Sequence, residues 1–367
     1  RRIDKSLGHD ITVPKDEDGM LQRAGRLGDL HELRKLEEYR EQFPGAVVEI
    51  ERPDYQDKTV SMEAQMAELS AKTLDALEAK APVVFQATFF DGEFQGFADF
   101  LVLTDEDEYA VYDTKLARKA KITALIQLAA YAHQLKLNGI PTSSKVHLIL
   151  GDQSISTYDI DDIMPTYLFR RKKMQELIAS RRQNKESGGS ASSWNDPSFV
   201  ACGRCVVCEP HVIENDDLLL ISDMRLDQRA ALMAAGIKTV RDLSATSLDS
   251  VSGLTQKTYE KIRSQARIQV KTRDQKDPLV PAFEVINAFG LEALPEPNPG
   301  DIFFDFEGDP LYQEGTLWNL DYLFGYVDEA GKFDPIWAHS IAEEKLALER
   351  FVKVIKDRLA KHPGMHV

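Results

Sequence analysis

The pattern of apolar and polar positions changes period repeatedly between residues 27 and 184, which predicts alternating helices and strands. Apolar residues three and four positions apart predict helices over these segments: 27–39, the stretch that holds Met62, Met66, Leu69 and Leu77, 121–137, and 167–180. Compact apolar runs predict strands over these segments: 47–51, 83–88, 97–103, 109–114 and 146–150. The acidic run 105–108 predicts a turn, so the strands on either side of it form a hairpin. This order indicates an α/β sandwich around a mixed sheet.

A mostly helical segment follows between residues 217 and 270. Residues 228–243 predict a helix, a turn at Gly236-Ile237 and a second helix. Residues 248–262 predict a second copy of this unit, with its turn at Gly253-Leu254. A small helical spacer is the simpler interpretation of the same pattern.

Composition changes separate these parts of the chain. Residues 185–195 are rich in Gly and Ser and predict a loop, and the prolines of 274–299 predict a linker. After the linker, 301–306 predicts an apolar strand. The predicted divisions are an α/β domain that includes the cysteines at 1–215, a helical module at 216–273, the linker at 274–299, and a last segment at 300–367.

The composition fits a folded protein of two or three domains, because 43% of the 367 residues are hydrophobic. No apolar run is long enough to span a membrane, and the polar start lacks a signal peptide, so we expect a cytoplasmic location. Arg1 is not an initiator methionine, and the apolar residues after Pro363-Gly364 look like the start of a strand, so we expect a fragment of a longer protein.

The formal net charge of −15 excludes a simple basic protein that coats nucleic acid. It does not exclude an enzyme that acts on nucleic acid, because binding can use local basic patches. Such patches occur at Lys115, Arg118, Lys119 and Lys121, at 170–173, and at 181–182. Each patch could equally be a solvated helix face.

The predicted hairpin carries the most specific chemistry of the chain. Asp99 lies in its first strand, Asp113 in its second, and Lys115 projects from the same face of the strand as Asp113. One or two carboxylates suffice for Mg²⁺, which keeps several waters. A bound metal lowers the pKa of a water, and a neighbouring lysine can orient that water or stabilise charge. The alternative is an ordinary hairpin with a salt-bridged lysine.

Two helices add polar residues to this pattern. Gln127 and Tyr131 are four positions apart, so they share one face of the helix after the hairpin. His31 lies inside the amphipathic helix before it. A lone helical histidine is usually structural, but here it precedes the Asp99 strand, the Asp113-Thr114-Lys115 strand and the Gln-Tyr helix.

This ordered set resembles the RecB-like branch of the PD-(D/E)XK nucleases, over most of residues 20–210. The resemblance implies a restriction-endonuclease-like core with a mixed sheet, and a cofactor of Mg²⁺ or Mn²⁺. Family members cut DNA, often from single-stranded ends, and are often fused to or partnered with helicases. By the family's pattern the metal ligands would be His31, Asp99 and Asp113, the catalytic residues would include Lys115, and the residues that hold DNA or support the site would be Gln127 and Tyr131.

Two later segments carry weaker resemblances. The helical module resembles a helix-hairpin-helix unit, in which turn amides contact a DNA phosphate. Asp305 in the predicted strand 301–306, and Glu307 two residues further on, resemble the opening motif of RNase H-like exonucleases of the DEDD type. Those enzymes need further acids, so we expect the start of an RNase H-like domain and no complete second site.

All three cysteines lie within seven residues, as Cys202, Cys205 and Cys208. This spacing favours metal binding over a disulfide framework, which normally uses an even number of cysteines. The C-x₂-C-x₂-C run resembles the ligation of a [4Fe–4S] cluster, whose fourth cysteine in several RecB-like nucleases lies upstream and has no counterpart here. The alternatives are zinc with His211 as fourth ligand, or no metal.

These observations predict a bacterial, metal-dependent DNA nuclease of exonuclease-like type, which acts in DNA repair or recombination with a helicase. The alternative is a catalytically silent DNA-binding adaptor that positions a fused helicase. Metal-dependent cutting of DNA distinguishes the two.

Overall fold

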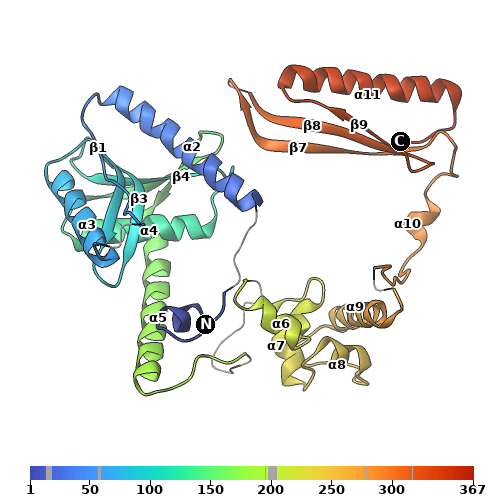
Figure 1. Cartoon of the computed structure of the whole chain (residues 1–367), viewed down its shortest axis with the longest axis horizontal. Helices are drawn as coiled ribbons and strands as arrows, with labels where there is room; N and C mark the ends of the chain where they lie inside the picture. The colour runs from blue at the N-terminus through green and yellow to red at the C-terminus, as the bar shows by residue number, and fades with distance from the viewer. Residues whose placement is uncertain (14–18, 57–58, 195, 197–204, 278, 316) are drawn as a thin grey trace. The chain divides into compact units, whose positions relative to one another are not determined.

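The structure is a computed structural model, and it describes residues 1–13, 19–56, 59–194, 196, 205–277, 279–315 and 317–367 (Figure 1). The chain divides into two compact units. One combines Arg1–Glu17 with Met174–Leu294, and the other combines Asp18–Lys173 with Pro295–Val367. Within the described parts, no helix has the length and apolar character that crossing a membrane requires.

A six-stranded mixed sheet forms the centre of the α/β domain, in the order β1-β2-β3-β4-β5-β6. Its strands are β1 (Val47–Glu49), β2 (Val83–Phe90), β3 (Gln95–Leu103), β4 (Tyr109–Lys115), β5 (Thr142–Leu150) and β6 (Ile155–Asp159). The pairs β1–β2 and β4–β5 are parallel, and the other neighbours are antiparallel. The predicted mixed α/β architecture is therefore confirmed.

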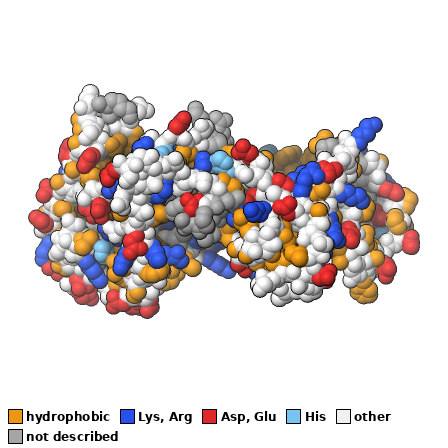
Figure 2. Space-filling model, turned by 90° about the horizontal axis from the view of Figure 1, so that it is seen from below, with side chains coloured by type: hydrophobic (Ala, Val, Ile, Leu, Met, Phe, Trp, Pro, Cys, Tyr) orange, Lys and Arg blue, Asp and Glu red, His pale blue; other side chains and the backbone are white. Residues whose placement is uncertain are grey.

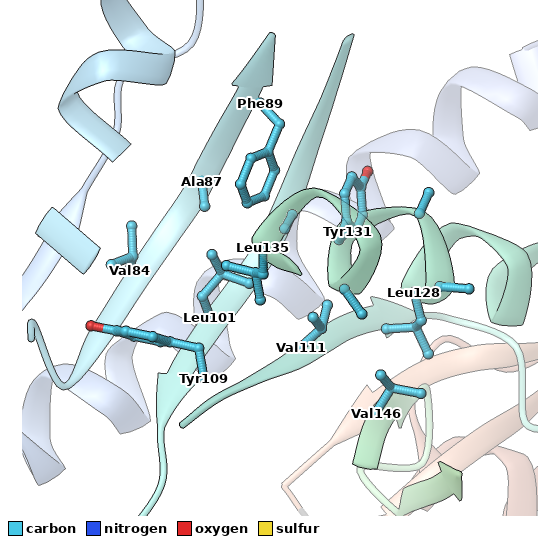
Figure 3. Close-up of a cluster of buried hydrophobic side chains, with 14 of the residues drawn as sticks. Val84, Ala87, Phe89, Leu101, Tyr109, Val111, Leu128, Tyr131, Leu135 and Val146 are labelled. Atoms are coloured by element: carbon cyan, nitrogen blue, oxygen red, sulfur yellow. The ribbon is translucent and has the colours of Figure 1, made fainter. Parts of the chain in front are cut away.

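Helices cover both faces of this sheet. The helices are α2 (Gly19–Gln42), α3 (Met62–Glu78), α4 (Ile122–Leu137) and α5 (Ile160–Glu186). On one face, Leu36 and Tyr39 of α2 pack on Phe85 and Phe100. On the other face, α3, α4 and the start of α5 bury a larger cluster against the strands. Figure 3 shows this second cluster, with Leu128 and Leu135 of α4 beside Val111 and Val146.

Local sequence signals explain how these elements begin. Ser61 caps α3 because its side chain accepts a hydrogen bond from the amide of Ala64. The turn between β3 and β4 uses Asp107 in the left-handed region, at φ 65°. The hairpin prediction is therefore confirmed, with Phe100 paired to Tyr112. The edge strand β6 and the early start of α5, before Pro165, were not predicted.

The short helix α1 (Arg2–Ser6) is tied to the end of α5 by a buried ion pair. Arg181 Nε lies 2.6 Å from Oδ1 of Asp4, whose other oxygen accepts a hydrogen bond from the amide of Ser192. The backbone bond from Ser192 and the pairing with Arg181 overcome the cost of burial and hold the pKa of Asp4 well below its usual range.

The helical module has its own small core. It comprises α6 (Glu209–Glu214), the 3₁₀ turn η1 (Leu218–Leu220), α7 (Leu226–Ala234), α8 (Val240–Ala245) and α9 (Gln256–Asp274). Leu218, Leu232, Val240 and Leu243 are fully buried in it. The buried pair of Asp217 and Arg229 crosses the module, with Arg229 Nη2 2.6 Å from Oδ2 of Asp217. After α9 comes the short α10 (Phe289–Glu292).

A separate three-stranded antiparallel sheet follows the proline-rich segment. It contains β7 (Ile302–Glu314), β8 (Leu317–Asp328) and β9 (Phe333–Trp337), and the long helix α11 (Ile341–Lys361) comes after it. Ala347 and Phe351 of α11 pack on Ile302 and Phe324. The predicted strand 301–306 is the first part of β7. The apolar end after Gly364 forms no strand, although the amide of Ile302 donates to the carbonyl of His366.

Candidate active site

The β3–β4 hairpin brings Asp99 and Asp113 onto adjacent strands. Phe100 pairs with Tyr112 in antiparallel register, so Asp99, which precedes Phe100, lies opposite Asp113, which follows Tyr112. Oδ2 of Asp99 accepts hydrogen bonds from the amide of Thr114 at 2.7 Å and from its hydroxyl at 2.8 Å. These bonds fix Asp99 against the end of β4, beside Asp113.

Asp113 is the most deeply buried acid of the hairpin. Its side chain has no exposed surface. Lys115 Nζ forms an ion pair with Oδ2, and no described residue donates a hydrogen bond to Oδ1. Burial, followed by the negative charge of Asp99, raises the pKa of Asp113 well above its usual range despite Lys115. The positive charge of Lys115 therefore does not offset the burial of Asp113 and the charge of Asp99.

A third carboxylate joins this group from α2. Glu32 is 8% exposed, and its Oε1 accepts a hydrogen bond from Nε2 of Gln86. Burial, followed by the negative charge of Asp99, raises the pKa of Glu32 to about 7. Sequence reasoning missed both Glu32 and Gln86. The available signals were an acid next to His31, and a single amide inside the apolar run 83–90.

Gln86 reaches Glu32 from an unusual backbone conformation. It has φ 53° inside β2, in the left-handed region that non-glycine residues rarely adopt. Its neighbours Phe85 and Ala87 pair with Phe100 and Ala98, so Gln86 lies opposite Asp99. Such local strain persists where the surrounding structure enforces it, and it concentrates at functional sites.

His31 lies on α2, one residue before Glu32, and is 4% exposed. Its Nε2 lies 3.3 Å from the carbonyl oxygen of Ile149, and its Nδ1 has no partner among the described residues. Because Nε2 must carry the proton to donate to a carbonyl, Nδ1 presents a lone pair. Burial, opposed by the bond to Ile149 and reinforced by the charge of Arg34, lowers the pKa of His31 and favours this neutral form.

Gln127 and Tyr131 meet on α4 as their spacing predicted. Gln127 Nε2 donates to the Tyr131 hydroxyl at 3.0 Å. Burial raises the pKa of Tyr131 to about 12, even though the bond from Gln127 favours ionisation. The Tyr131 ring lies against Gly96, where an added Cβ would come within 2.8 Å of Cε1. Figure 3 shows Tyr131 at the edge of the core with its hydroxyl turned outward. The pair therefore supports the start of β3 near Asp99.

These residues fit a hard divalent cation in donor chemistry. Asp99 and Asp113 supply oxygen donors, and Oδ1 of Asp113 has no hydrogen bond to lose. The arrangement of His31, with one nitrogen on a carbonyl and the other unpartnered, is typical of metal-ligating histidines. No group of three or more His, Cys, Asp or Glu side chains gathers tightly enough to hold a metal anywhere in the described ranges. The expected triad of His31, Asp99 and Asp113 is therefore not gathered into a metal site in this structure.

The first turn of the helical module uses its amides internally. The amides of residues 236 to 241 all donate to protein acceptors: the carbonyls of Met233, Leu232 and Asp216, and the side chains of Asp242 and Asp216. Gly236, at φ 85°, ends α7 in the bonding pattern of a Schellman motif. The expectation that this turn offers amides to a phosphate is therefore wrong for Gly236-Ile237.

Two of the three cysteines lie in the described part of the chain, and Cys202 lies outside it. The carbonyl of Cys205 accepts hydrogen bonds from the amides of Cys208 and Glu209, so the C-x-x-C segment closes into a turn before α6. The two thiols thus come from the two ends of one tight turn. His211 follows on α6, where its ring stacks on Trp194 and Nδ1 lies 3.6 Å from Glu214.

Asp305 and Glu307 are both exposed on β7. They pair in register with Gly325 and Leu323 of β8. Phe304 and Phe306, at the alternate positions, contact Phe351 of α11. Asp305 and Glu307 therefore lie on the sheet face opposite α11.

Comparisons of this chain with protein-family models, with curated proteins and with solved structures found no match.

Proposed function

We propose that the chain is a metal-dependent DNA nuclease that hydrolyses phosphodiester bonds. The observation that carries this proposal is Asp113, a fully buried carboxylate that is paired with Lys115 and lies next to Asp99. Its other oxygen, Oδ1, has no hydrogen-bond partner among the described residues, and leaving a buried carboxylate oxygen unsatisfied is costly. The cost is consistent with a site arranged for a cation.

The proposed metal is Mg²⁺ or Mn²⁺, held by Asp99 and Asp113, with His31 as a further ligand. Such an ion supplies a water of lowered pKa and neutralises charge on the phosphate. Lys115 would orient the attacking water or stabilise the charge that develops on the phosphate, since it is part-exposed and aligned with Asp113. Gln127 and Tyr131 would hold the strand end in place beside the substrate.

The same proposal assigns a fold to each part of the chain. The six-stranded domain would be restriction-endonuclease-like, the α7–α9 region helix-hairpin-helix-like, and β7–β9 with α11 the start of an RNase H-like domain. An antiparallel three-stranded sheet followed by a helix supports the last of these. Asp305 and Glu307 alone would not form a complete site. Basic and acidic side chains are interspersed on the face in Figure 2, so DNA contacts would be local.

Cutting of labelled DNA tests the proposal. Lys115→Ala should lower the cutting rate by about 10²–10³-fold while binding, measured with Ca²⁺ in place of Mg²⁺, stays within about twofold. Lys136→Ala removes an exposed lysine in the last turn of α4, outside the candidate basic patches, and is the matched control. Equal cutting by the wild type and Lys115→Ala would reject the nuclease assignment. Binding without cutting by the wild type would favour the silent adaptor.

A further inference from the structure

A small cleft opens beside His31, between α2 and the end of β5. It encloses about 50 Å³ and is lined by these residues: His31, Arg34, Lys35, Glu38, Ile149 and Gln153. The four α2 residues are spaced three and four apart, so they share one helix face. Neither the sequence motifs nor the proposed chemistry assigns a role to Arg34, Lys35 or Gln153.

The cleft carries one uncompensated positive charge. Lys35 Nζ lies 2.7 Å from Oε2 of Glu38 and 4.8 Å from the centre of the Tyr39 ring, so its charge is balanced. The guanidinium of Arg34 lies 5.7 Å from the centre of the Trp318 ring, but it forms no ion pair with any described residue, and its buried Nη1 has no hydrogen-bond acceptor there. A buried guanidinium donor without an acceptor is costly, and a bound anion would remove that cost.

The cleft adjoins the proposed scissile position. Ile149 pairs directly with Thr114, whose amide and hydroxyl hold Asp99. Adjacent strands lie about 5 Å apart, so the wall of the cleft is one strand from Asp113 and Lys115. A ligand in the cleft would therefore lie close to the phosphodiester bond that is cut.

We propose that this cleft is a subsite for a phosphodiester of the substrate strand, next to the bond that is cut, with Arg34 as its principal donor. The inference rests on the proposed function. A net charge of one suits a phosphodiester, which carries one negative charge, better than a terminal phosphate, which carries nearly two. Gln153, in the left-handed region at φ 66°, adds a neutral amide at the rim.

The test measures binding of a short labelled single-stranded DNA in Ca²⁺ over a salt series. Arg34→Gln should weaken binding by about tenfold and reduce the salt slope by about one. Arg34→Lys should restore the slope and part of the affinity. Arg40→Gln is the matched control, because Arg40 lies on the same helix but pairs with Glu37 and Glu49.

Each outcome either supports or rejects the phosphodiester subsite. If Arg34→Gln binds with wild-type affinity and slope, the subsite is rejected even where cutting requires Lys115. If adding a 5′-phosphate to the DNA strengthens wild-type binding and Arg34→Gln removes only that gain, a terminal phosphate replaces the phosphodiester. If the wild type neither binds nor cuts DNA, inorganic phosphate is titrated and followed by ³¹P NMR. If the wild type broadens the phosphate signal and Arg34→Gln does not, the cleft binds an anion although the chain is not a nuclease. If the wild type does not broaden the signal, the subsite and the nuclease assignment are both rejected.

Discussion

Gln86 Nε2 donates a hydrogen bond to Oε1 of Glu32, and it does so from a left-handed backbone position within a β-strand. The bond joins α2 to β2 across from Asp99. It holds a third carboxylate near two others, in a site where ionisation is opposed by burial and by like charge. The free energy of unfolding of the α/β domain should therefore fall as pH rises, because these carboxylates must ionise in a buried site.

The first prediction concerns that dependence in the absence of metal. Because the pKa of folded Glu32 is raised from 4.5 to about 7, its protonated form favours folding. The contribution is fully present below about pH 4.5 and is lost as pH rises through about 7. Glu32→Gln removes the buried charge, so the variant should be more stable than the wild type at pH 8 by on the order of 1–3 kcal/mol.

Hydrogen exchange of the β2 and β3 amides, corrected for the intrinsic rate at each pH, measures this difference. At pH 5 the difference in stability between Glu32→Gln and the wild type should be smaller than at pH 8. Glu41→Gln, an exposed change on the same helix, should show no gap at either pH. A variant that is less stable than the wild type at pH 8 would show that ionised Glu32 is stabilised by its neighbours.

The second prediction concerns Gly151, which follows β5 beside the end of β4. An added Cβ would lie 2.1 Å from the carbonyl oxygen of Leu116, the residue after Lys115. Gly151→Ala should therefore displace the Lys115 segment, lower stability by about 1–3 kcal/mol and reduce cutting. Thermal unfolding and the cutting assay measure the two effects.

A matched glycine provides the control. Gly28 lies within α2, and an added Cβ there would meet only Leu116 Cδ1, at 4.0 Å. Gly28→Ala should raise stability by about 0.5–1 kcal/mol through helix propensity and leave cutting unchanged. Tolerance of Gly151→Ala in both assays would mean that the Leu116 backbone moves freely without affecting Lys115.

Sequence alone could predict the hairpin, the Gln-Tyr helix face and the alternation of elements, because these depend on local periodicity and turn residues. It could not predict that Gln86 faces Glu32, since that contact requires a left-handed residue in β2 and the packing of α2. The strand β6 was also missed. It is short, with exposed and half-buried residues, and it forms only by pairing with β5.

The third prediction separates the two glycine turns of the helical module. Gly236→Val should cost about 1–2 kcal/mol, because valine is strained at φ 85°, and it should leave DNA affinity unchanged because the nearby amides are already bonded. Gly253 has φ 86°, and α9 begins three residues later at Gln256, where the first amides of a helix have no acceptor within the helix itself. If the module contacts DNA, Gly253→Val should weaken binding.

Affinity is measured over a salt series, with circular dichroism to show that each variant is folded. Equal losses of affinity in Gly236→Val and Gly253→Val would point to a general loss of structure. No loss in either would favour the helical spacer, which needs no contact with phosphate.

The last prediction concerns the cysteines. The turn that begins at Cys205 presents two thiols, and Cys202 would supply a third, so a [4Fe–4S] cluster held this way would have one open iron. Protein purified without oxygen should be brown and should bleach in air. Cys205→Ser and Cys208→Ser should each lower the bound iron and destabilise the helical module, because metal binding is coupled to folding. His211→Gln should leave the iron content unchanged, because His211 is a ligand only in the zinc alternative. Metal analysis and the visible absorption spectrum measure these effects, and stoichiometric zinc that depends on His211, without iron, would replace the cluster by a zinc site.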